Sequence, residues 1–88
     1  MKINICNAEW EVLLKDLTDK ESDGLTEFNS QTIYIEKSLH PHRKAVTLTH
    51  ELLHVICDYV GITEDEDLIL RLEHHVYDLI KKFPEEFK

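Results

Sequence analysis

Residues 41–61 read PHRKAVTLTHELLHVICDYVG, and this stretch decides both the fold and the chemistry. Its apolar residues recur at intervals of three and four, the spacing that places side chains on one face of an α-helix. Pro41 suits a first helical turn, and Gly61 suits the position just after a last turn. The pattern predicts one helix over residues 42–60. Its apolar face would consist of Ala45, Leu48, Leu52, Leu53, Val55, Ile56 and Tyr59.

Within this helix, the segment His50-Glu51-Leu52-Leu53-His54 carries the chemistry. Residues four apart lie one above the other on a helix, so both imidazoles can reach the same ion. Glu51 points about 100° away from His50, close enough to contact a water on that ion without ligating the ion. This HExxH arrangement is typical of zinc hydrolases, in which two histidines bind the metal and the glutamate is the general base. The competing interpretation is a helix with two ordinary histidines.

A catalytic zinc ion usually takes a third protein ligand, and the downstream candidates are Glu73, His74 and His75. They lie in a second predicted helix over residues 63–83, which we expect Pro84 to end. Its apolar face would consist of Ile69, Leu72, Val76, Ile80 and Phe83. Glu73 falls within that face, where a carboxylate needs a partner because burying an unpaired charge is unfavourable. We therefore predict Glu73 as the third metal ligand and the two histidines as surface residues.

Two further residues near His54 are weaker candidates. Cys57 lies one turn later on the same face, where a thiolate could ligate zinc, but a single cysteine there more often serves packing. Asp58 either orients His54 from behind or faces solvent. Neither residue enters the predicted ligand set.

The first half of the chain reads as strands. Alternating or β-branched apolar residues predict strands over 2–6, 10–14, 25–28 and 31–36, separated by polar turns. We therefore predict an α+β fold in which a small antiparallel sheet of three to four strands packs with two helices. The chain is long enough for a single domain over residues 1–88.

The composition excludes several function classes. Eighteen acidic and ten basic residues give a formal net charge of −8, which is unsuited to a phosphate backbone or an anionic membrane surface. No run of 18 apolar residues is present, so no segment is expected to span a bilayer. The N-terminus has no signal-peptide pattern, and the two cysteines have no CxxC spacing. We expect a cytoplasmic protein without nucleic-acid or membrane partners.

With these residues in view, the chain resembles the ImmA/IrrE family of zinc metallopeptidases, in a minimal form like those of bacterial and phage genomes. The matching stretches are residues 32–39, residues 43–54 (RKAVTLTHELLH) and residues 73–84 (EHHVYDLIKKFP). The resemblance implies a zincin-like fold and Zn²⁺ as the cofactor. It implies His50, His54 and Glu73 as zinc ligands and Glu51 as the general base.

The resemblance also implies hydrolysis of a peptide bond in a protein or peptide substrate, often a repressor or another regulator. For substrate binding we expect the strand within residues 32–35 to be an edge strand that pairs with an extended peptide. Tyr77 and Tyr34 are candidate donors to the developing oxyanion.

Two rival functions stay open at this level. The first is a non-catalytic zinc-binding or protein-interaction module, a relic of such an enzyme. Glu51 favours the enzyme, because a structural site has no use for a carboxylate between its two histidines. The second is a zinc hydrolase acting on RNA or a small molecule, and the net charge disfavours RNA.

Overall fold

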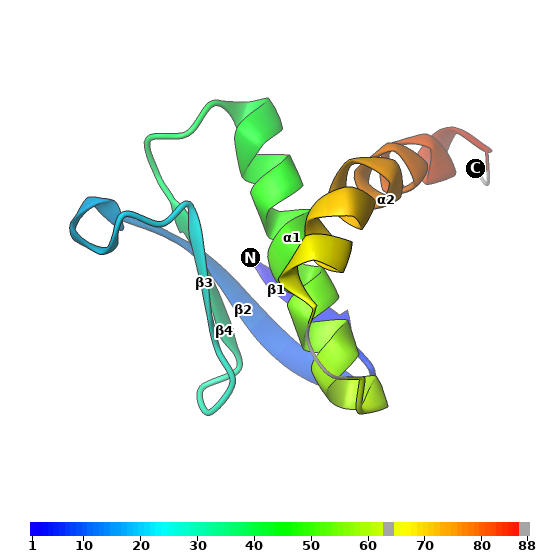
Figure 1. Cartoon of the computed structure of the whole chain (residues 1–88), viewed down its shortest axis with the longest axis horizontal. Helices are drawn as coiled ribbons and strands as arrows, with labels where there is room; N and C mark the ends of the chain where they lie inside the picture. Colours follow the sequence, from blue (N-terminus) through cyan, green and yellow to red (C-terminus); the bar gives the residue numbers. More distant parts are fainter. Residues whose placement is uncertain (63–64, 87–88) are drawn as a thin grey trace.

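The structure is a computed structural model that describes residues 1–62 and 65–86, with side chains for residues 1–62 and 65–82. One four-stranded sheet packs with two helices (Figure 1), which confirms the predicted α+β class. The elements in chain order are β1 (Lys2–Ile5), β2 (Ala8–Lys15), the 3-10 helix η1 (Thr18–Lys20), β3 (Gly24–Glu27), β4 (Thr32–Glu36), α1 (Pro41–Val60) and α2 (Glu66–Glu86).

The sheet is mixed, whereas an antiparallel sheet was expected. Strands β1 and β2 form one antiparallel hairpin and β3 and β4 form another, but β2 and β4 pair in parallel. Parallel neighbours need a crossover, and here η1 and β3 provide it. The strand order β1-β2-β4-β3 makes β4 an internal strand. The prediction of an edge strand within residues 32–35 is therefore wrong, and the edge on this side of the sheet is β3.

Helix α1 lies across one face of the sheet and supplies the helical side of the core. Val55 is fully buried there, together with the sheet residues Ile5, Trp10, Val12, Ile33 and Ile35. Leu48 and Leu52 pack against this cluster as predicted. Ile56 and Tyr59 are partly exposed instead, because they lie at the margin of the face that contacts the sheet. The Tyr59 hydroxyl still accepts a hydrogen bond of 3.1 Å from Trp10 Nε1, which links the end of α1 to β2.

Helix α2 packs on α1 (Figure 1). Of its predicted apolar face, Ile69 is buried, but Leu72 and Ile80 are 39% and 48% exposed, because α2 makes its main contacts with a single helix. The backbone stays helical through Glu86, so the expected end at Pro84 is wrong. A proline this close to the end removes a single donor from the last turn. The predicted helix start at residues 63–64 lies outside the described residues.

No helix in the described part of the chain is both long and apolar enough to cross a bilayer.

The connection from β4 to α1 is fixed by the buried carboxylate of Glu36. The Leu17 and Ser38 backbone N–H groups both donate to this carboxylate, so it joins the end of β2 to the loop before α1. Hydrogen bonds from Ser38, and then from Leu17, hold the pKa of Glu36 below its ordinary value.

We predict that Glu36→Gln lowers the urea midpoint of unfolding at neutral pH, measured by the fluorescence of the single tryptophan. Because the folded-state pKa is lowered, the stabilisation by ionised Glu36 is complete above the ordinary glutamate pKa. It is lost as the pH falls through the lowered folded value. The difference between wild type and variant should therefore shrink on acidification, and a difference that grows instead would contradict this account.

Candidate metal centre

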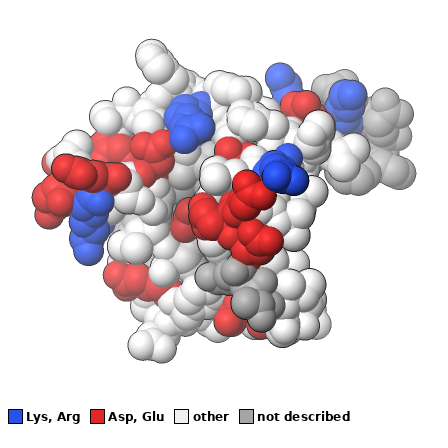
Figure 2. All heavy atoms as spheres, viewed as in Figure 1, with Lys and Arg blue, Asp and Glu red and all other residues white. Residues whose placement is uncertain are grey.

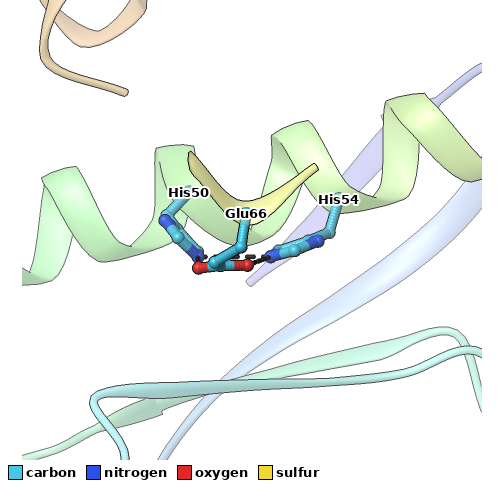
Figure 3. Close-up of side chains that lie close together, drawn as sticks. All are labelled: His50, His54 and Glu66. Carbon is cyan, nitrogen blue, oxygen red and sulfur yellow. Dashed lines mark hydrogen bonds and ion pairs between the residues drawn. The ribbon is translucent and has the colours of Figure 1, made fainter. Parts of the chain in front are cut away.

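Two histidines one turn apart on α1 form the centre of the site. Their side chains are mostly buried, and His50 Nε2 lies 3.2 Å from His54 Nε2 (Figure 3). Two nitrogen ligands of a tetrahedral zinc ion, each about 2.05 Å from the metal, are separated by about 3.3 Å. The two imidazoles are therefore spaced as a shared metal ion requires, in agreement with the helical spacing in the sequence.

Glu66, in the first turn of α2, contacts both imidazoles (Figure 3). Its Oε1 lies 2.9 Å from His50 Nε2, and its Oε2 lies 3.0 Å from His54 Nε2. A carboxylate is an acceptor only, so these contacts require a proton or a metal cation between the groups. His50, His54 and Glu66 each offer a ligand atom within 4.8 Å of the others, and this cluster is compatible with a metal ion.

Glu73 approaches the same imidazole from its other edge. Its Oε2 lies 2.7 Å from His50 Nδ1, and the side chain is buried. A carboxylate that is ionised only accepts, so Nδ1 is the donor to an ionised Glu73. A neutral imidazole with its proton on Nδ1 has its Nε2 lone pair available to a metal ion in the cluster. The burial of Glu73 and its need for a partner agree with its place in the predicted apolar face. Its role as third metal ligand stays a prediction, because the structure brings it to His50 but not into the cluster with His54.

The sequence analysis missed Glu66. Its acidic neighbours suggested the ordinary preference of helix N-termini for negative charge, which explains such residues without a metal. A usable signal was present in the short connection after Gly61. A connection of this length brings the first turn of α2 back alongside the second half of α1, within reach of His54.

Glu51 is buried on a different side of α1 from the two histidines, facing the edge strand. The Thr26 hydroxyl, on β3, donates a hydrogen bond of 2.8 Å to Glu51 Oε1. Two cavities meet at this carboxylate, one of about 310 Å³ toward Arg43 and Glu73 and one of about 340 Å³ toward His54. The predicted base therefore lies next to the cluster of His50, His54 and Glu66, and it lines the same two cavities as His50.

The remaining candidates lie away from the cluster. His74 and His75 are exposed, as predicted, and His74 is only 3.8 Å from Glu73 Oε1. Cys57 is partly buried and Asp58 is exposed.

Neither tyrosine candidate is supported as an oxyanion donor. Tyr34 lies between Ile33 and Ile35 in β4, so it points to the sheet face opposite α1, where the Lys15 ammonium lies 4.7 Å from its ring. The Tyr77 ring contacts the His42 ring, with centroids 5.3 Å apart.

Comparison with known proteins adds a family to this geometry. The family model Peptidase_M78, described as IrrE N-terminal-like domain, matches residues 7–87. The matched range contains β2, β3, β4, both helices and every residue of the cluster. No curated protein and no solved structure gives a significant match to the chain.

Proposed function

The chain belongs to the IrrE N-terminal-like family of peptidases, and from this premise we propose that it is a zinc-dependent metallopeptidase that hydrolyses a peptide bond in a regulatory protein. The observation that carries the proposal is the relation of three side chains on α1. Two imidazole nitrogens 3.2 Å apart are suited to a shared metal ion, and the buried Glu51 lies beside them. A purely structural metal site would not need this carboxylate.

We propose His50 and His54 as two zinc ligands and Glu73 as the third. Glu73 is supported by its burial and by its place in the wall of a cavity that His50 and Glu51 also line. As a ligand it would exchange its hydrogen bond with His50 Nδ1 for the metal. Glu66 is the second candidate, because it contacts both imidazoles. It is 58% exposed, whereas Glu73 is 9% exposed, so holding Glu66 in one conformation costs more side-chain entropy.

Bound zinc would supply a Lewis acid for the scissile carbonyl and lower the pKa of a coordinated water to about 7. The chain's own residues would perform the proton transfers. Glu51 accepts the proton of the attacking water and then delivers it to the leaving amine.

An extended peptide is the substrate form that the edge of the sheet suits. Strand β3 offers a free edge next to Glu51, and a peptide that adds to this edge would pass the base. Acidic side chains outnumber basic ones on the face shown in Figure 2, which supports a protein or peptide substrate over a nucleic acid. The two free cysteines support a reducing, cytoplasmic location.

A protein-interaction module without turnover is the alternative function. The observation that favours it is the set of exposed apolar side chains on α2, which could contact another protein. This set consists of Leu68, Leu70, Leu72, Leu79 and Ile80.

The first test is the metal itself. Protein purified without chelator should carry about one zinc ion per chain by plasma mass spectrometry. Glu73→Ala should weaken zinc affinity roughly a hundredfold or more, measured by competition with a chelating dye. His75→Ala is the control and should change the affinity by less than about threefold, because His75 is exposed.

Glu66→Ala decides between the two carboxylates. With Glu73 as the third ligand, the loss of the exposed Glu66 should cost much less affinity than the loss of Glu73. The reverse ranking would assign the third position to Glu66. Wild-type protein that retains no zinc after reconstitution would contradict the proposed metallopeptidase function. The alternative function, a protein-interaction module, would then be favoured.

Glu51→Gln should keep the zinc affinity within a few fold and lower peptide hydrolysis by roughly a hundredfold or more, because an amide cannot accept the proton. The measurement is turnover of fluorescein-labelled casein by zinc-loaded protein. Hydrolysis at the wild-type rate in this variant would remove Glu51 from the role of base.

A further inference from the structure

The edge strand β3 presents two unusual positions to the catalytic helix. Gly24 and Thr26 pair with Ile35 and Ile33, whose side chains lie in the core beneath α1. Residues paired in this way point to the same face of a sheet, so positions 24 and 26 both face α1. One of these positions carries a hydroxyl, and the other carries no side chain.

The hydroxyl of Thr26 holds one oxygen of the base. It donates to Glu51 Oε1 at 2.8 Å, and Glu51 is 8% exposed. A carboxylate in such a place without a donor would bear the full cost of desolvation. The hydrogen bond lowers the basicity of Oε1 and fixes the plane of the carboxylate, so Oε2 is the more basic oxygen toward a proton from water. The hydrogen bond therefore favours Oε2 as the proton acceptor and fixes the direction in which this oxygen points.

The missing side chain at Gly24 makes this hydrogen bond geometrically accessible. A Cβ at this position would lie 2.8 Å from Thr47 Cγ2 and 3.1 Å from Glu51 Cγ. Both distances are shorter than ordinary contacts between carbon atoms, so α1 or the Glu51 side chain would have to shift. Because Gly24 has no side chain, the Glu51 side chain can pack directly against β3 and reach the Thr26 hydroxyl.

The backbone of Thr26 faces the free edge of the sheet. The Glu36 N–H donates to the Asp23 carbonyl at 2.8 Å across the β3–β4 pair. Because alternate residues of an antiparallel strand direct their backbone groups to opposite sides, Gly24 and Thr26 direct theirs away from β4. The Gly24 carbonyl accepts a hydrogen bond of 2.6 Å from the Ser22 hydroxyl. Thr26 thus offers its backbone to an added strand and its side chain to the base.

We propose that Thr26 is a positioning residue for Glu51, which aligns the base with a peptide bound along β3. This inference rests on the proposed peptidase function and deepens it. Hydrolysis moves one proton from water to Glu51 and then from Glu51 to the leaving amine, and the Thr26 hydroxyl keeps its own proton throughout.

The contact itself can be tested without activity, on metal-free protein. Urea midpoints for wild type, Thr26→Val, Glu51→Ala and the double variant form a double-mutant cycle. Thr26→Val should lower the midpoint clearly when Glu51 is present and much less in the Glu51→Ala background. Equal shifts in both backgrounds would show that the two side chains are uncoupled and would overturn the proposal.

The positioning role is tested by kinetics on zinc-loaded protein with fluorescein-labelled casein as the probe. Thr26→Val should lower kcat about tenfold, the scale of one hydrogen bond to a charged group, with KM changed by less than about twofold. Thr26→Ser, which keeps the hydroxyl, should restore kcat to within about threefold of wild type. Zinc affinity should be unchanged in both variants.

Thr32→Val is the matched control. It removes the hydroxyl of a buried threonine on the neighbouring strand, where Thr32 Oγ1 donates to the Ser30 carbonyl, and it should leave kcat unchanged. An unchanged kcat in Thr26→Val, or an equal loss in Thr26→Ser, would refute positioning through the hydroxyl. Wild-type protein that binds zinc but shows no turnover would refute the peptidase function itself, whatever the cycle shows about the contact.

Discussion

The packing of α1 against the sheet is the constraint on which the rest of this structure depends. Val46 and Val55 are almost fully buried, and Val55 lies in the core with Ile33 and Ile35. Successive residues of a helix point about 100° apart, so fixing one face fixes the direction of every other side chain. His50 and Glu51 are neighbours in the sequence, yet this rotation directs one toward α2 and the other toward β3.

The same periodicity explains how α2 surrounds the imidazole of His50. Glu66 and Glu73 are seven residues apart, which is close to two helical turns, so both lie on the same face of α2 about 10.5 Å apart along its axis. The ring lies between them, with Nε2 toward Glu66 and Nδ1 toward Glu73. One helix face thereby supplies a carboxylate to each nitrogen of a single histidine.

The parallel pairing of β2 and β4 has a comparable effect on the other side of α1. It places β4 inside the sheet and moves β3 to the edge, directly beside Glu51. The crossover thus determines which strand is available to an extended peptide. It also determines that Thr26 and Gly24, rather than residues of β4, contact the base.

The sequence by itself determined the features that depend on neighbours a few residues away. The helical period predicted α1 and the shared direction of His50 and His54, and the polar turns separated the strands that pair as β1–β2 and β3–β4. Burial of Glu73 followed in the same way, from its distance to Ile69 and Val76 along one helix. These features are local, because backbone geometry relates residues within about two turns of a helix or one hairpin.

Only the tertiary structure decided what depends on contacts between distant segments. Each of these contacts joins residues far apart in the chain. They are the parallel pairing of β2 with β4, which leaves β3 at the edge, the contact of Glu66 with both histidines, and the hydrogen bond from Thr26 to Glu51. An acidic residue in the first turn of a helix has a sufficient local explanation, so the residue type and position of Glu66 did not by themselves indicate a contact with the histidines. A threonine in a strand is equally ordinary until the packing of α1 places a buried carboxylate against it.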